Sequence, residues 1–271
     1  MCRTLNVGVS GYFAWWRRPE NRYVQADVIL TASIQKIHQE SRGTYGAPRV
    51  QAVLADDGLR VSRARITRLM KAAGLKVRCK RKFRITTNSK HRHPVAENLL
   101  NREFTANQPN QKWVTDITYL PTHKGWIYLT VVMDLFSRKI VGWAMRKTLH
   151  TELVVATLEM AQQTRRPGQG ILHHSDQGVQ YASSEYRQAL ERLQALQSIS
   201  RKGECWDNAA MESFFATLKM ELELHKAKGN RTDTRNLVFE WIEVFYNRER
   251  RHSSLGYRSP TRFEEHQARP N

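Results

Sequence analysis

The chain has 271 residues, of which 40% are hydrophobic, so it can form a packed core and is not disordered throughout. Its formal net charge of +19 indicates a polyanionic partner or an acidic surface, with nucleic acid as the leading candidate. Three widely separated cysteines, Cys2, Cys79 and Cys205, argue against a disulfide framework and against a zinc finger.

The amino terminus and the most apolar stretch argue against export and membrane insertion. The first residues lack the sustained apolar segment and the cleavage site of a signal peptide. Residues 126–136, "WIYLTVVMDLF", are too few to cross a bilayer and include Asp134. We therefore expect a soluble, intracellular protein.

Positive charge is concentrated in the first part of the chain. Residues 1–110 contain 21 Lys and Arg against 7 Asp and Glu, whereas residues 111–271 contain 23 against 18. A basic part joined to a nearly balanced part suggests a region that holds nucleic acid, attached to a region that acts on it.

Three short helices are predicted in residues 25–77, which follow an N-terminal segment of residues 1–24. The second helix starts near Pro48, and the third starts at Ser62, which is a favourable N-cap. The third helix is basic, so the set is typical of a helix-turn-helix module. An ordinary three-helix bundle with solvated arginines is the alternative. The candidate DNA contacts on the third helix are Arg63, Arg65, Arg68 and Lys71.

Residues 78–108 are predicted to be a basic linker or arm. The stretch "KVRCKRKFRITTNSKHRH", residues 76–93, contains eight Lys and Arg and no acid, so it cannot bury much surface. On a duplex, each phosphate that such a stretch neutralises releases a counterion. A solvated tether is the alternative, but the density of charge favours phosphate contact. The candidate residues are Lys80, Arg81, Lys82 and Arg84.

Residues 109–271 have the pattern of an α/β domain that ends in a basic tail. Three stretches rich in β-formers follow one another between residues 112 and 145 and predict an antiparallel meander. After them come a helix, a short strand, a helix, a fifth strand and an amphipathic helix, at residues 151–164, 170–176, 183–196, 197–200 and 207–224. This order predicts a five-stranded mixed sheet with helices on both faces.

Three acidic residues occupy informative positions in these elements. Asp116 lies inside the first strand, where a buried charge is costly unless it is paired or bound to metal. Asp176 ends the short strand in "HHSDQGVQY", where it could be a turn-former or a ligand. Glu212 lies near the start of the amphipathic helix, with 35 residues between it and Asp176.

This order of acids resembles the retroviral-integrase superfamily, whose catalytic core has a ribonuclease-H-like fold. A more specific resemblance is to the second-frame (OrfB-type) transposases of the insertion-sequence-three family. It rests on the phrases "HQESRGTYGAPRV", "RITRLMKAAGL", "HHSDQGVQYAS", "SISRKGECWDNAAMESFFATLKMELE" and "FYNRERRHSSLGYRSP". The resemblance runs from about Gly11 to Phe263, which is nearly the whole chain.

The resemblance implies that Asp116, Asp176 and Glu212 are catalytic and bind two Mg²⁺ ions per active site, with Mn²⁺ as a substitute. Electrostatics agrees, because two carboxylates about 4 Å apart repel each other by roughly 1–4 kcal/mol and need cations or raised pKa values to persist. Two such ions about 4 Å apart promote in-line displacement at phosphorus. On this interpretation Asp176 is a metal ligand, and Gly178 keeps its loop compact.

We expect other polar residues near these acids to have structural roles. Asp134 precedes "LFSRK" and is expected to tie a hairpin turn. Of His173 and His174, we expect one in the core and the other facing the cleft. Asp207 and Asn208 are expected to cap the amphipathic helix, although a DNA contact is the alternative.

Four residues in the last third of the chain are candidate DNA contacts. Lys219 lies two turns after Glu212 on the same helix face, and a lysine so placed contacts the DNA end in the retroviral integrases that the chain resembles. A surface ion pair with Glu223 is the alternative. The other three follow the last predicted helix, where a solvated basic tail is the alternative: Asn247, Arg250 and His252.

The resemblance implies a DNA transposase that binds element ends and catalyses metal-dependent strand cleavage and strand transfer. Its partners would be double-stranded DNA of the terminal repeats and the target, further copies of this chain, and the product of an upstream reading frame. We expect a bacterial cytoplasmic enzyme at the nucleoid. Two alternatives stay open: a nuclease or resolvase on the same core that cleaves without joining, and a non-enzymatic DNA-binding regulator.

Overall fold

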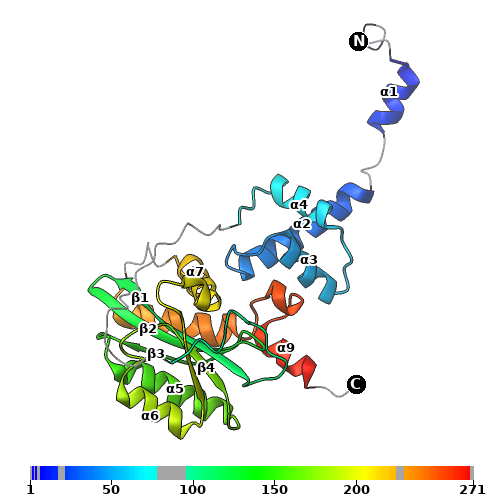
Figure 1. Ribbon diagram of the computed structural model, residues 1–271. Coiled ribbons are helices and arrows are strands. Elements are labelled where there is room, and N and C mark those ends of the chain that lie inside the picture. The colour runs from blue at the N-terminus through cyan, green and yellow to red at the C-terminus, as the bar shows by residue number, and fades with distance from the viewer. Residues whose placement is uncertain are drawn as a thin grey trace. The chain divides into compact units, whose positions relative to one another are not determined.

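The computed structural model describes residues 2, 4, 7–17, 22–77, 96–223 and 229–268 of the chain (Figure 1). The chain divides into two compact units, Met1–Arg78 and Cys79–Asn271. In the part of the chain so described, no helix is both long and apolar enough to cross a membrane.

The first unit is helical. Its helices are α1 (Val9–Trp16), α2 (Arg22–Glu40), α3 (Ala47–Asp56) and α4 (Arg63–Ala72). The apolar stripes of α2, α3 and α4 meet in one core, in which Ile34, Val50 and Ile66 are fully enclosed. Helix α4 begins as predicted, because the Ser62 hydroxyl accepts a hydrogen bond from the Arg65 backbone N–H. The sequence pattern does not predict α1, and none of its side chains is buried.

The second unit contains the predicted five-stranded mixed sheet, with strand order β3-β2-β1-β4-β5. The strands are β1 (Lys112–Thr122), β2 (Gly125–Asp134), β3 (Ile140–Arg146), β4 (Leu172–Ser175) and β5 (Leu196–Ile199). The first three form an antiparallel meander, whereas β4 runs parallel to β1 and to β5. Strand β1 is therefore central, and its residues have a neighbouring strand on each side.

Helices cover both faces of this sheet (Figure 1). Helices α5 (Thr151–Arg165) and α6 (Ser184–Arg192) share a core with one face, and α7 (Ala209–Glu221) shares a second core with the other. Gly142 in β3 lets α5 approach closely, because a Cβ at this position would collide with the Thr157 carbonyl.

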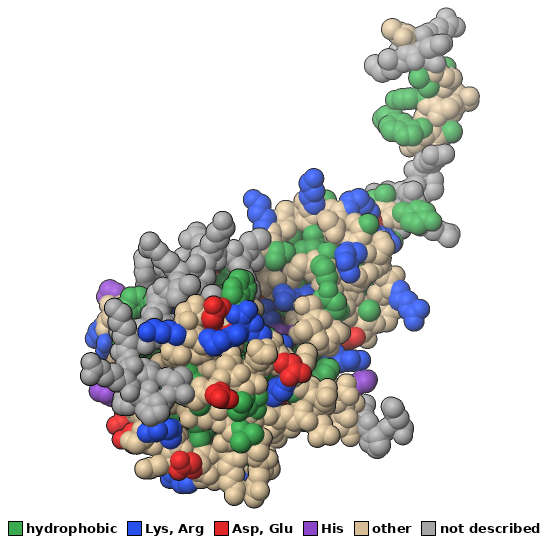
Figure 2. Space-filling model, viewed as in Figure 1, with side chains coloured by type: hydrophobic (Ala, Val, Ile, Leu, Met, Phe, Trp, Pro, Cys, Tyr) green, Lys and Arg blue, Asp and Glu red, His purple; other side chains and the backbone are tan. Residues whose placement is uncertain are grey.

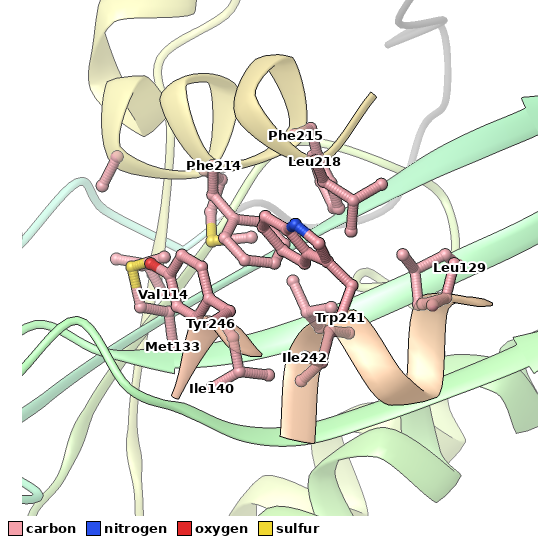
Figure 3. Close-up of a cluster of buried hydrophobic side chains, with 14 of the residues drawn as sticks. Val114, Leu129, Met133, Ile140, Phe214, Phe215, Leu218, Trp241, Ile242 and Tyr246 are labelled. Carbon is pink, nitrogen blue, oxygen red and sulfur yellow. The ribbon is translucent and has the colours of Figure 1, made fainter. Parts of the chain in front are cut away.

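An aromatic cluster holds α7 against the sheet (Figure 3). Phe214 of α7 packs edge-to-face against Trp241 and Tyr246, with ring centroids 5.7 and 5.0 Å apart. These two rings belong to a π-helical turn, η3 (Glu240–Tyr246), which continues α8 (Arg231–Phe239). The sequence pattern predicts neither α8 nor the π-helical turn, yet this segment fixes the helix that carries Glu212.

Two segments that the sequence assigns to the basic arm and the basic tail pack against the rest of the sheet unit. In residues 96–108, the described end of the predicted arm, Leu100 is buried and its backbone N–H donates to the Ser198 hydroxyl at 3.1 Å. The predicted basic tail contains α9 (Pro260–Gln267), where Glu264 binds Arg165. Local composition does not reveal these contacts, because the partners of both segments are remote in sequence.

Candidate active site

Asp116 lies in the middle of β1, opposite Val131 of β2, and its carboxylate accepts a hydrogen bond from the Ile117 backbone N–H at 2.7 Å. The residue keeps some contact with solvent, but protein atoms surround the carboxyl group, and this burial raises its pKa well above the usual value. The charge of Asp176 raises the pKa further, and Glu212 adds a smaller increase. Asp116 therefore lies within electrostatic reach of the other two predicted catalytic acids.

Asp176 follows the last residue of β4, and the parallel pairing with β1 brings it towards Asp116. The register pairs Val114 of β1 with His174 of β4, and neighbouring strands lie about 4.8 Å apart. Asp116 and Asp176 each follow their paired residue by two positions, so the pairing brings the two acids towards each other. Asp176 Oδ1 accepts a hydrogen bond from the Gly178 N–H at 2.9 Å. A Cβ on this glycine would approach that oxygen to 3.0 Å, so glycine allows the turn to close tightly, as predicted.

Glu212 lies in the first turn of α7, and Asn208 joins the start of this helix to β1. The Asn208 amide donates to the Thr115 carbonyl at 3.1 Å, directly before Asp116. It makes no side-chain cap, so the predicted capping role is wrong, and its buried Oδ1 has no partner among the described residues. Burial raises the pKa of the half-exposed Glu212. Asn208 thus fixes the Glu212 helix relative to the Asp116 strand.

Asp207 is fully buried in the turn η1 (Cys205–Asn208), which leads into α7. Its carboxylate accepts hydrogen bonds of 2.7 to 2.9 Å from the side chains of Asn98, Arg102 and Arg201. The Arg201 guanidinium is the largest cause that holds the pKa of this carboxyl far below its usual value, and it outweighs burial. Asp207 neither caps the helix nor contacts solvent. It anchors the turn that precedes Glu212.

Lys219 places a positive charge beside the acids. Its ammonium group lies over the Tyr119 ring, 5.2 Å from the centroid. Burial lowers the pKa of Lys219, and the charge of Asp116 partly offsets this effect. In turn, Lys219 lowers the pKa of Asp116, but less than Asp176 raises it.

The three acids are hard oxygen donors whose charges repel one another. Across the described ranges, no three His, Cys, Asp or Glu side chains stand close enough to make a finished metal site. Burial raises the pKa of Asp116 most, and the charges of Asp176 and Glu212 raise it further. Carboxylate oxygens are the ligands that Mg²⁺ and Mn²⁺ prefer, so the donor set fits these ions.

The two histidines and Asp134 stabilise the core. Both His173 and His174 are buried, so the expectation that one faces the cleft is wrong. His173 Nε2 lies 2.6 Å from the Tyr186 hydroxyl, and burial lowers the pKa of this imidazole to about 3. The turn predicted at Asp134 is confirmed, because its carboxylate accepts the Phe136 backbone N–H at 3.0 Å.

Two predicted DNA contacts near the C-terminus are wrong, because their side chains are buried inside the core. The Asn247 amide donates to the Ile140 carbonyl at 3.0 Å and accepts the Ile140 N–H at 2.9 Å. The Arg250 guanidinium binds the buried carboxylate of Glu221 at 2.8 Å. His252 is partly exposed, and its DNA contact stays a prediction.

The candidate contacts on α4 divide into two pairs. Arg65 and Arg68 both bind Asp27 of α2, although the Arg68 side chain stays 61% exposed, whereas Arg63 and Lys71 are exposed and lie outside this ion pair. In the face of the molecule shown in Figure 2, Lys and Arg side chains outnumber the acidic ones. The candidates on the arm lie outside the described residues: Lys80, Arg81, Lys82 and Arg84.

Comparison with known proteins identifies the family. Residues 106–205 and 193–260 match families described as integrase core domains, and residues 25–83 match an HTH-like domain. A 31 kDa protein of insertion element IS600 from Shigella sonnei is 45% identical, over 98% of this chain and 97% of the relative. The transposase InsF of insertion sequence IS3A from Escherichia coli is 39% identical, over 97% of this chain and 92% of the relative. The chain belongs to the IS3 family of transposases.

The transposase also shares its fold with a chain of a simian T-cell lymphotropic virus intasome, solved in complex with PP2A regulatory subunit B56 gamma. The TM-score is 0.52 at 16% identity, over 88% of this chain and 76% of the viral chain, so the likeness concerns the fold alone. The predicted fold class and family are confirmed. The transposase is a polynucleotidyl transferase with an HTH-like DNA-binding module, and integrase-type cores of this kind depend on metal ions.

Sequence reasoning singled out Asp207 and Asn208 before Glu212, but it missed the partners through which they hold the turn before α7. No local pattern identifies their partners, because Arg102 lies 105 residues from Asp207 along the chain.

Proposed function

We propose that Asp116, Asp176 and Glu212 are the catalytic residues of this transposase and together hold two divalent cations, Mg²⁺ or its substitute Mn²⁺. The observation that supports this most strongly is the buried carboxyl group of Asp116, which lies within electrostatic reach of the other two acids. A fold keeps such repulsion only if something offsets it. When bound, two such cations activate the attacking oxygen and stabilise the leaving oxygen of an in-line displacement at phosphorus.

The side chains of the site have separate tasks in this proposal. The turn closed by Gly178 orients Asp176, and Asn208 sets the position of Glu212 relative to Asp116. Lys219 contacts a phosphate of the DNA end, because its ammonium group is near enough to Asp116 to act on its pKa. The attacking group is water in end cleavage and a DNA 3′-hydroxyl in strand transfer, so no covalent enzyme intermediate is needed.

DNA recognition is assigned to α4 and the basic arm. Arg63 and Lys71 are exposed on α4, and their charge suits the phosphates of the element ends. The substrates are double-stranded terminal repeats and target DNA. Further copies of the chain on the DNA and the product of an upstream reading frame are the proposed protein partners, and the bacterial nucleoid is the proposed location.

Three substitutions test the catalytic assignment: Asp116→Asn, Asp176→Asn and Glu212→Gln. Each should abolish nicking of element ends and their joining to target plasmid with Mg²⁺, while duplex binding persists. Glu159→Gln, at an exposed position on α5, is the matched control and should retain activity. Retained strand transfer in any of the three would remove that residue from the site.

The same assays separate the alternatives. A nuclease or resolvase would cleave the ends without joining them to the plasmid. A DNA-binding regulator would bind equally well with and without Mg²⁺, and none of the three substitutions would change anything it does.

A further inference from the structure

Trp206 is a large apolar side chain that the proposed catalytic roles leave unused. It is 66% exposed and lies in the turn η1, six residues before Glu212. A tryptophan usually buries much of its surface, and in binding sites it is a preferred rigid contact. The residues around Trp206 should therefore explain why this side chain is exposed so close to Glu212 in the chain.

The turn that carries Trp206 is held in place on both sides. Asp207, which follows it, is fully buried and bound by Arg102 and Arg201, and Asn208 is tied to the β1 backbone. Before it, Glu204 binds Arg102, and the Asp207 backbone N–H donates to the Glu204 carbonyl at 3.1 Å. Because Asp207 and Asn208 are bound to the interior of the unit, the turn is fixed and the Trp206 indole points towards solvent.

Positive charge surrounds this support. The side chains of Arg102 and Arg201 stay 43% and 50% exposed while they bind Asp207, and Lys202 is exposed as well. Three cations, Arg102, Arg201 and Lys202, lie in or bind residues 201–207, which contain two acids. Both acids, Glu204 and Asp207, are already bound by arginine. An anionic partner with a flat apolar part would match both the charge and the indole.

We propose that the Trp206 indole stacks on an unpaired nucleobase of the DNA strand whose phosphodiester is acted on at Asp116, Asp176 and Glu212. Nucleobases offer a flat π-face to aromatic side chains, and arginines beside the ring contact the strand backbone. This inference rests on the proposed function of the acidic site. It adds that the last base pairs of the element end are open when the transposase binds that end.

The position of the turn limits which base is stacked. Six residues along a helical path correspond to a distance on the order of 10 Å between Trp206 and Glu212. Adjacent nucleotides are about 3.4 Å apart in a duplex strand and farther apart in an opened one, so the stacked base lies within about three nucleotides of the phosphate that reacts.

Equilibrium binding without Mg²⁺ tests the proposal. The probes are two duplexes of one terminal sequence, one fully paired and one with its last few bases unpaired, each with 2-aminopurine about three nucleotides from the cleavage position. The wild-type protein should prefer the frayed probe about tenfold and should quench its 2-aminopurine fluorescence, since stacking on an aromatic ring contributes about 1–3 kcal/mol per base. Trp206→Ala should lose both effects, and Trp206→Phe should retain most of them.

Trp126→Ala is the matched control, because this tryptophan is also exposed, at 51%, in the same unit. It pairs with Pro121 of β1, five residues from Asp116, and should keep the preference for the frayed probe. An unchanged preference and unchanged quenching in Trp206→Ala would overturn the proposal. So would a change in self-association of Trp206→Ala without a change in base preference, because the indole would then be a contact between copies.

This experiment is independent of catalysis. If the wild-type protein stacks the base but Asp116→Asn still transfers strands, the catalytic assignment fails and the stacking site stands. If Asp116→Asn is inactive but Trp206→Ala binds both probes like the wild type, the stacking site fails and the catalytic assignment stands.

Discussion

Two acidic regions of the sheet unit differ in how the fold compensates their charge. At the end of β2, Arg165 binds both Asp134 and Glu264, at 2.9 and 2.8 Å. In the middle of β1, burial and the charge of Asp176 raise the pKa of Asp116, and Lys219 offsets only a small part. The fold supplies an arginine where Asp134 and Glu264 join segments, and leaves Asp116 within electrostatic reach of two other acids where we propose the chemistry.

The directions of the pKa shifts separate Glu264 from Asp116, whereas the pKa of Asp134 is raised like that of Asp116. Burial raises the pKa of Asp134, but backbone N–H groups and Arg165 act against it. Burial also opposes ionisation of Glu264, yet the hydrogen bonds from Arg165 hold the pKa of that carboxyl below its usual value. The pairing with Arg165 favours the ionised form of Glu264, whereas Asp116 would gain from a bound cation.

The largest expected effect separates the two regions directly. Asp116→Asn should lower the rate of end nicking about a thousandfold or more, because a metal ligand contributes several kcal/mol to the transition state. In metal-free buffer it should raise the free energy of unfolding, because it removes a buried, repelled charge. Asp134→Asn should instead lower stability, because it weakens the hydrogen bonds from Arg165 and the Asn110 backbone N–H, and it should leave the rate per folded molecule unchanged. Urea denaturation and single-turnover nicking check both, and equal stability changes in the two variants would end the comparison.

The next effect concerns Glu221, a paired acid at the end of α7. Arg250→Met leaves the Glu221 carboxylate buried without its guanidinium, which should lower the free energy of unfolding by about 3–5 kcal/mol. Arg248→Met, at an exposed neighbouring position, should change it little. The double variant Arg250→Met/Glu221→Leu should recover most of the loss in urea denaturation, because it removes both charges. A double variant as unstable as the single one would show that packing, not charge, explains the effect.

A smaller effect is expected from pH at His173. Its folded-state pKa of about 3 lies below the unfolded value of 6.5, so between these pH values the unfolded chain binds the extra proton. The stability that depends on a neutral imidazole is complete above pH 6.5 and is lost as the pH falls towards 3. His173→Gln should remove on the order of 3 kcal/mol of this pH dependence at pH 4. The control is His150→Gln, at an exposed position, which should follow the wild-type curve.

The smallest effects extend the comparison to DNA binding. Replacing Arg63 and Lys71 by Gln should reduce the slope of log affinity against log salt by close to one unit for each lost phosphate contact. The same result is expected for the arm residues Lys80, Arg81, Lys82 and Arg84. Asp27→Asn releases Arg65 and Arg68 from their pairing and should not reduce the slope. Titrations at several salt concentrations check this, and an unchanged slope in the arm variant would show that the arm is only a tether.

Much of the sheet unit follows from the sequence, because its patterns are local. Alternating apolar residues around Asp116 predict β1, and the periodicity around Phe214 predicts α7. The three acids are found from their order and spacing, and the structure brings Asp176 towards Asp116 through the parallel pairing of β4 with β1. These features can be predicted from the alternation of side chains along a strand and their periodicity along a helix.

The tertiary structure decided what the polar residues outside this triad do. Asn247 and Arg250 read as surface contacts in the sequence, but the packing of η3 against α7 encloses them. Asp207 reads as a helix cap, but arginines from two distant segments bind it. The sequence by itself determined the five strands, helices α2 to α7, the family and the candidate acids, because short-range periodicity and motif spacing encode them. Which charges are paired depends on contacts between remote segments, and only the folded chain specifies those.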